Sequence, residues 1–185
     1  MQKNKIMVIG ALACALSGFF LGLLEVEQKA EAALLPNPPE PVIEQPVVEP
    51  EPVKLYTEAD VDMLARLIYT EARGVQSRTE QAAVVWCVLN RLDNPNRPEN
   101  SITEVVTSPY QFAYRADAPV LSEYRELAED VLERWQAEKN GAADVGRVLP
   151  KEYQYFEGDG GRNWFSKEWR SAEYWGWELD SPYED

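Results

Sequence analysis

A proline-rich segment over residues 35–54 limits which part of this chain can fold into a globular core. Proline lacks a backbone N–H and has a fixed φ, and proline-rich chains adopt an extended form that rises ~3.1 Å per residue. Glutamates alternate with the prolines and add like-charge repulsion. We therefore interpret residues 35–54 as an extended linker between a leader (residues 1–34) and a domain (residues 55–185). The seven prolines are Pro36, Pro38, Pro39, Pro41, Pro46, Pro50 and Pro52.

The leader contains an apolar run from Ile6 to Leu24, preceded by Lys3 and Lys5. This length fits the ~20 apolar residues of a membrane-spanning helix better than the ~7–15 of a signal-peptide core. The positive flank predicts that the rest of the chain is exported. The Ala30-Glu31-Ala32 segment resembles a cleavage site, so a cleaved signal peptide is the alternative to a membrane anchor.

The composition excludes several kinds of catalytic chemistry. The 185 residues include no histidine and two cysteines, Cys14 and Cys87, so His-dependent nucleophile systems and Cys- or His-rich metal sites are not expected. The formal net charge of −14 argues against a nucleic-acid partner, because such binding rests on Lys and Arg against phosphate. We expect no metal and no cofactor, and carboxylates are the residues left to carry protons.

The domain has the pattern of a mainly α-helical fold. Sequences typical of helix N-termini begin at Thr57, Ser77 and Ser101. The helix after Ser77 is apolar on nearly all sides and should be the central element of the core, with Cys87 as a small core residue. A further amphipathic helix spans Tyr124 to Trp135.

Glycines and aromatic residues define the remaining elements. Gly74 and Gly141 should end helices by adopting the left-handed conformation. Alternation around Tyr155 predicts a strand, and the glycine-rich residues 157–163 after it predict a flexible turn. The many aromatic residues beyond residue 163 could fill a core or line a groove.

Glu71 is the residue whose position most suggests chemistry. It lies three residues after Ile68 and seven after Leu64, on or beside the apolar face of the first helix. Burial raises the pKa of a carboxyl, and a carboxylic acid that stays protonated near neutral pH is what a glycosidase general acid requires. The alternative is a structural carboxylate paired with Arg73 or Arg91.

Several segments of the domain resemble the SleB-type cell wall hydrolases, which include the spore-cortex-lytic enzymes. The segment from Leu64 to Gly74, which contains Glu-Ala-Arg-Gly, resembles the family signature. Residues 81–85 and 88–91 are similar to the family's second helix, and residues 111–112 match its Gln-Phe element. Tyr155-Phe156 and Trp164 resemble its C-terminal aromatic strand and tryptophan.

The resemblance implies a lysozyme-like, mainly α (α+β) domain that cleaves peptidoglycan between MurNAc and GlcNAc. Glu71 would be the acid/base of a lytic transglycosylase, and Gln111, Tyr155, Trp164 and Asn90 would bind the glycan. We expect the chain to act as a monomer. A hydrolase would need a second carboxylate, and a noncatalytic glycan-binding or scaffold module of the same fold is the alternative function. The candidates for a second carboxylate are Asp93, Asp117, Glu157 and Asp159.

Overall fold

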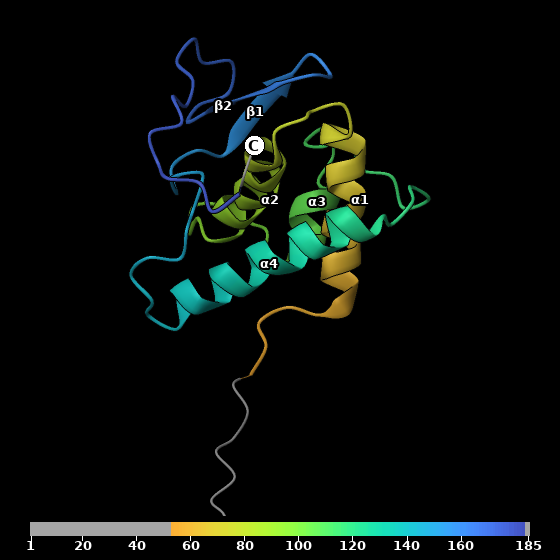
Figure 1. Ribbon diagram of the computed structural model, residues 1–185, viewed down its shortest axis with the longest axis vertical. Helices are drawn as coiled ribbons and strands as arrows, with labels where there is room; N and C mark the ends of the chain where they lie inside the picture. Colours follow the sequence, from red (N-terminus) through yellow and green to blue (C-terminus); the bar gives the residue numbers. More distant parts are fainter. Residues whose placement is uncertain (1–52, 184–185) are drawn as a thin grey trace, which may run out of the picture. The chain divides into compact units, whose positions relative to one another are not determined.

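The computed structural model describes residues 53–183, which form a mainly helical domain with a small two-stranded sheet (Figure 1). The predicted fold class, mainly α with a small β element, is confirmed. The leader and nearly all of the linker, with the predicted anchor or signal peptide, lie outside the described residues. Within residues 53–183, no helix has the length and apolar character needed to cross a membrane. The elements are α1 (Glu58–Ala72), α2 (Arg78–Leu92), α3 (Ile102–Thr107), α4 (Ser122–Lys139), β1 (Tyr155–Gly158) and β2 (Asn163–Ser166).

The first and last helices pack against each other across the domain, and Figure 1 shows α4 crossing α1. α1 begins at the predicted capping box, in which Thr57 Oγ1 accepts the Asp60 N–H and the Asp60 carboxylate accepts the Thr57 N–H. α4 buries one face from Tyr124 to Trp135, as its spacing predicts. Gly141 follows α4 with φ 97°, so its expected left-handed conformation is confirmed.

α2 is the central helix, because every residue from 79 to 91 is buried. It packs against α1, α3, α4 and β1. Cys87 is fully buried, and burial raises the pKa of its thiol to about 11. Its expected role as a core residue is therefore confirmed, and its thiolate is strongly disfavoured.

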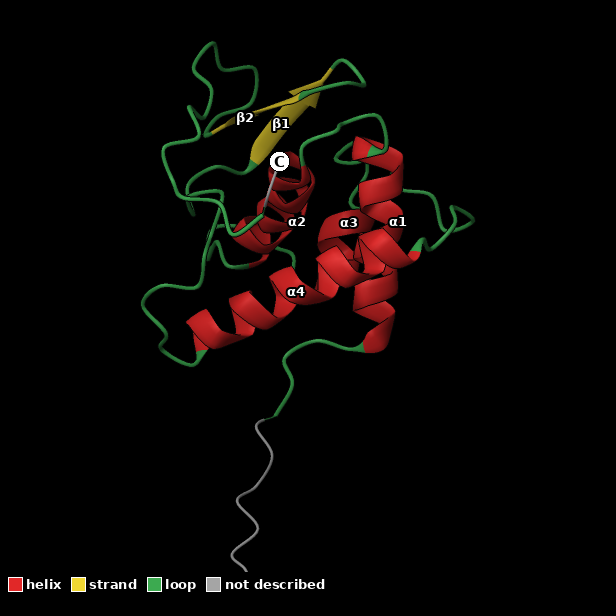
Figure 2. Cartoon of the chain, in the orientation of Figure 1, coloured by secondary structure: helices red, strands yellow, loops and turns green. Residues whose placement is uncertain are grey.

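The sheet lies at one end of the helices, beside α2 (Figure 2). β1 and β2 are antiparallel, with Phe156 opposite the buried Phe165 and their ring centroids 5.3 Å apart. The sequence predicts a flexible turn over residues 157–163, and this prediction is wrong because the turn in the structure is shorter. β1 continues to Gly158 and β2 begins at Asn163, so the turn is only four residues long.

This turn is well defined by hydrogen bonds. The Asp159 carboxylate accepts the backbone N–H groups of Gly161 and Arg162, each at 2.9 Å. Gly160 adopts φ 91°, a conformation that favours glycine. The glycines therefore allow a tight hairpin here. The number of glycines in the sequence had instead indicated a longer, flexible loop.

Residues 167–183 follow β2 without regular secondary structure and are held to the domain by aromatic side chains. Trp175 Nε1 donates to the Val148 carbonyl at 3.1 Å, and the Trp177 ring lies 5.8 Å from that of Phe165. By contrast, Trp169 is 65% exposed. The C-terminal aromatics thus serve both of the roles that the sequence left open, some in the core and others at the surface.

Candidate active site

Glu71 lies in the last turn of α1, at the edge of the helix face that enters the core. Ile68 and Ala72 beside it are buried, while Glu71 itself is partly buried. Its carboxylate accepts a hydrogen bond from the backbone N–H of Ala113, in the loop between α3 and α4. The loop therefore fixes one oxygen of the carboxylate and leaves the other without a hydrogen bond from the described residues.

Burial is the largest influence on the Glu71 carboxyl and raises its pKa. The Ala113 N–H and the positive charge of Arg91 act in the opposite direction, because both favour the charged form. The resulting pKa lies above the ordinary value of a glutamate. Arg73 instead donates to the Tyr69 carbonyl. Within residues 53–183, neither of the two arginines considered as ion-pair partners donates a hydrogen bond to Glu71.

Arg91, whose positive charge acts on Glu71, contacts a group of polar and aromatic side chains. Its Nη1 donates to Gln111 Oε1 at 2.9 Å. Its guanidinium carbon lies 4.6 Å from the ring centroid of Phe112 and 5.3 Å from that of Tyr155. The structure thus brings two of the predicted binding residues, Gln111 and Tyr155, into one cluster around Arg91.

Two hollows are lined by residues that contact Glu71 or Arg91. One, of about 340 Å³, is lined by Ala113, Tyr69 and Arg73 among others, and so reaches the loop that binds Glu71. The other, of about 290 Å³, is lined by Tyr155 and its neighbours on the sheet. Glu71 itself lines neither hollow; the first reaches its hydrogen-bond partner Ala113, and the second reaches Tyr155, which contacts Arg91.

Gly74 lets the β-hairpin approach the end of α1. The predicted left-handed conformation of Gly74 is wrong, because the positive-φ glycines among the described residues are Gly141, Gly146 and Gly160. A Cβ on Gly74 would instead lie 2.0 Å from the carbonyl oxygen of Gly160. Glycine is required here by the close contact between two backbones.

Glu80 holds the same hairpin from the other side, a role that its sequence position did not reveal. Ser77 caps α2 as predicted, accepting the Glu80 N–H at 3.1 Å. The Glu80 carboxylate accepts the Asn163 N–H at 2.9 Å and lies 3.7 Å from Arg162 Nε. The sequence pattern assigned this carboxylate to helix capping, whereas it binds a segment 83 residues away.

Asn90, predicted to bind the glycan, is 2% exposed and makes hydrogen bonds within the domain. Its Nδ2 donates to the carbonyls of Pro150 and Tyr153, both at 2.8 Å. Its Oδ1 accepts from Arg147 Nη1 at 2.6 Å. With both amide hydrogens used internally, Asn90 supports the segment leading into β1 and is not exposed to a ligand.

Trp164 is partly exposed on β2, opposite Glu157. Cross-strand partners project from the same side of a sheet, so Trp164 and Glu157 share one face. The contacts that join Arg91, Gln111 and Tyr155 do not include Trp164.

The candidate second carboxylates each have a local partner. In residues 53–183, no group of three or more Cys, Asp or Glu side chains is arranged to hold a metal ion. The partners are Lys139 for Asp93, Arg115 for Asp117, Tyr174 for Glu157, and the turn backbone for Asp159. Glu71 is partly buried, its pKa is raised by that burial, and its hydrogen bond comes from the backbone N–H of Ala113.

The chain belongs to the cell wall hydrolase family, whose model matches residues 75–179. The family resemblance drawn from the sequence is therefore confirmed. The matched region covers α2 to the C-terminal aromatic segment and begins just after Glu71.

Two similar curated proteins are spore cortex-lytic enzymes. The one from Bacillus subtilis is 32% identical over 77 residues, which are 42% of this chain and 25% of that protein. The one from Halalkalibacterium halodurans is 35% identical over 65 residues, which are 35% of this chain and 19% of that protein. The chain thus spans a quarter or less of the length of either relative. No solved structure gave a significant match.

Proposed function

We propose that this chain cleaves the glycan strands of peptidoglycan between MurNAc and GlcNAc, with Glu71 as the acid/base. Membership of the cell wall hydrolase family supports peptidoglycan as the substrate. The observation that carries the catalytic assignment is the Glu71 carboxyl, which is partly buried, has a raised pKa and is bound by Ala113, a residue that lines one of the hollows. A neutral carboxylic acid at such a position can protonate a leaving oxygen.

The reaction we propose is an intramolecular transfer that needs one carboxylate. Glu71 donates its proton to the glycosidic oxygen as the bond from that oxygen to C1 of MurNAc breaks. The Glu71 carboxylate then takes the proton of the 6-hydroxyl group of the same MurNAc as that oxygen bonds to C1. The products are a 1,6-anhydro end and a free 4-hydroxyl group on the departing sugar, and Glu71 is again protonated.

The surroundings of Glu71 suit both halves of this cycle. The Ala113 N–H stabilises the carboxylate form and fixes one oxygen, while burial favours the acid form. The first step needs the acid form and the second needs the carboxylate, and each form is favoured by one of these influences. Gln111 and Tyr155, held by Arg91, are the side chains we propose to contact the glycan nearest to Glu71. Trp164 would contact it only farther along the sheet.

The location of the enzyme follows from the leader. We propose that the domain acts outside the cytoplasmic membrane, because Lys3 and Lys5 precede the apolar run. The linker would hold the domain away from the membrane if the leader is retained. A reporter that is active only outside this membrane, fused after Val53, should be active if the chain is exported.

Cleavage can be tested with purified peptidoglycan in a renaturing gel and in a turbidity assay, using the full chain. The wild-type protein should clear the gel and lower the turbidity. Binding to peptidoglycan without any loss of turbidity would instead favour the noncatalytic module and contradict the proposed function.

The pH dependence of cleavage should follow the raised pKa of Glu71. The acid form is required for the first step, so the rate should fall as the pH rises through that raised pKa. The measurement is the initial rate of turbidity loss across a pH series, with circular dichroism at each pH as a control for folding. A rate that rises steadily through the range above the ordinary glutamate pKa would contradict an acid role for Glu71.

A further inference from the structure

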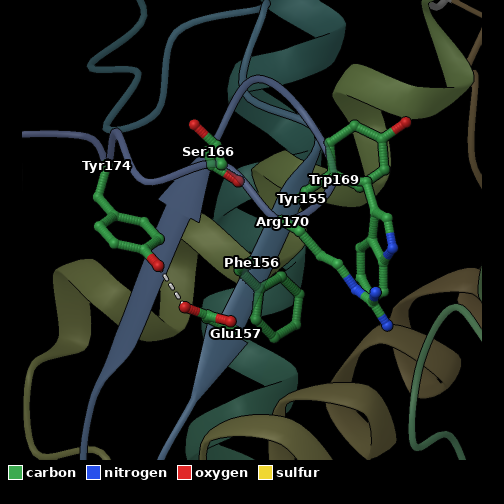
Figure 3. A pocket seen from close by; sticks show the side chains of 8 residues that line it. Tyr155, Phe156, Glu157, Ser166, Trp169, Arg170 and Tyr174 are labelled. Atoms are coloured by element: carbon green, nitrogen blue, oxygen red, sulfur yellow. Dashed lines mark hydrogen bonds between the residues drawn. The ribbon is translucent and has the colours of Figure 1, made fainter.

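A second feature of the surface lies beyond the cluster around Arg91, in the hollow between the sheet and the segment that follows β2. Figure 3 shows Tyr155 and Trp169 side by side here, with the Arg170 side chain reaching the Trp169 ring. Tyr174 closes the other end through its hydroxyl group, which donates to Glu157.

Trp169 has the properties of a binding platform. It is 65% exposed, which is unusual for the largest apolar side chain. Its ring lies 6.3 Å from the Tyr155 ring at an interplanar angle of 55°, so one side of the indole is supported while much of its surface is open. An open aromatic face with polar groups around it suits the apolar face of a sugar ring.

Arg170 supplies a free positive charge beside that platform. Its guanidinium carbon lies 5.7 Å from the Trp169 ring centroid. In the described part of the chain its guanidinium makes no hydrogen bond or ion pair, although the whole chain carries a net charge of −14. The φ of Arg170 is 59°, in the left-handed region that non-glycine residues rarely adopt.

The platform is linked to the proposed catalytic site through Tyr155 and Arg91. Tyr155 contacts both Trp169 and Arg91. Arg91 in turn binds Gln111 and contributes to the electrostatic environment of Glu71. A chain of sugars lying over Glu71 could therefore extend along this surface to Trp169.

We propose that Trp169 and Arg170 form an outlying subsite that selects a muramic acid residue carrying a negatively charged side chain. The sugar ring stacks on Trp169, and Arg170 pairs with a carboxylate of the lactyl group or of the peptide attached to it. The preference for a carboxylate follows from Arg170, because a guanidinium binds a carboxylate more strongly than it binds the neutral oxygens of an uncharged sugar. A nucleic acid is disfavoured by the net charge of −14. This subsite rests on the proposed function for its substrate class.

The test uses a matched pair of ligands that cannot be cleaved. N-acetylmuramyl-L-alanine carries one carboxylate, and its carboxamide has the same shape without the charge. Binding to the full chain is measured by NMR from the indole N–H signal of Trp169, assigned by its loss in Trp169→Phe. The acid should bind on the order of tenfold more tightly than the amide, as a charge-assisted hydrogen bond allows.

The variants separate the two parts of the subsite, with binding followed in each by ligand-observed NMR. Arg170→Gln should remove the preference for the acid and change binding of the amide less than twofold. Trp169→Ala should weaken both ligands by about fivefold or more, whereas Trp169→Phe should retain most of the affinity. Lys151→Gln, which changes the charge equally at a site bound to Glu138, is the control and should change neither affinity. Thermal unfolding of each variant confirms that it is folded.

Equal binding of acid and amide by the wild-type chain would overturn the subsite, as would unchanged binding by Trp169→Ala. These readouts do not depend on cleavage. If the wild-type chain cleaves peptidoglycan but shows no preference for the acid, the subsite fails and the proposed function stands. If it prefers the acid through Arg170 but cleaves no glycan, the proposed function fails and the subsite stands.

Discussion

Replacing Glu71 with glutamine should lower the rate of peptidoglycan cleavage by about 10²–10⁴-fold, the usual contribution of general acid–base catalysis. Glutamine keeps the volume of the side chain and an oxygen that can accept the Ala113 N–H. It cannot donate a proton to the glycosidic oxygen. The measurement is the initial rate of turbidity loss, and Glu123→Gln on the exposed side of α4 is a control with the same change of charge.

The same substitution should leave the fold intact and change the pH dependence of stability. The pKa of Glu71 is higher in the folded state than its ordinary value, so the folded chain binds more protons than the unfolded chain between the two pKa values. Glu71 therefore makes the wild type less stable as the pH rises through this window. The free energy of unfolding of Glu71→Gln, relative to wild type, should increase over the same window.

For the cleavage assay, a rate of Glu71→Gln within a few-fold of wild type would show that Glu71 is not the acid.

Replacing Gly74 with alanine should destabilise the domain and impair cleavage together. The new Cβ would lie 2.0 Å from the Gly160 carbonyl oxygen, so the hairpin must move away from the end of α1. Overpacking of this kind costs about 1–3 kcal/mol, although the loss of glycine's freedom in the unfolded chain offsets about 0.4–1 kcal/mol. Denaturant unfolding gives the stability change, and turbidity loss gives the rate.

Gly161→Ala is the matched control for this prediction. Gly161 belongs to the same hairpin, its φ is not in the left-handed region, and a Cβ there would come no closer than 3.7 Å to the Asp159 carboxylate. This variant should be as stable as the wild type or slightly more stable. Equal stability of Gly74→Ala and Gly161→Ala would mean that the close approach of Gly160 does not constrain Gly74.

Local patterns predicted the helical part of this fold well. Helix starts at Thr57, Ser77 and Ser101 were readable because each N-cap bond involves residues three apart. The central position of α2 was readable because its apolar residues surround the whole helix. These signals depend on neighbours in sequence, and tertiary contacts agree with them here.

What the sequence could not reveal depends on contacts between distant segments. The sequence pattern predicts a helix end at Gly74, and α1 does end at Ala72, but the glycine is required by its contact with Gly160 and not by a left-handed conformation. Glu80 fits a capping box, yet it binds Asn163. Asn90 has a polar side chain beside a candidate site, but its amide satisfies two buried carbonyls. A polar residue in a helix pattern does not show whether its partner is solvent, substrate or another part of the chain.

In the candidate site, too, local patterns were predictable from the sequence and contacts between distant segments were not. Helix periodicity placed Glu71 at the edge of the core, and its partial burial and raised pKa agree with that prediction. The Ala113 N–H that binds it carries no sequence signal, because any residue except proline offers that donor. Trp169 was one aromatic residue among several, and only the fold distinguishes its exposed ring from the anchored Trp175 and Trp177.

The role of Glu71 is tested most directly by mass spectrometry of the fragments released from purified peptidoglycan by the full chain and by Glu71→Gln. We expect fragments with 1,6-anhydro muramic acid ends from the wild type, and their near absence with the variant at equal protein and time. Fragments with reducing ends would replace the transfer mechanism with hydrolysis that uses a second carboxylate. The same glycan fragments in equal amounts from both proteins would contradict the central claim that Glu71 carries the reaction.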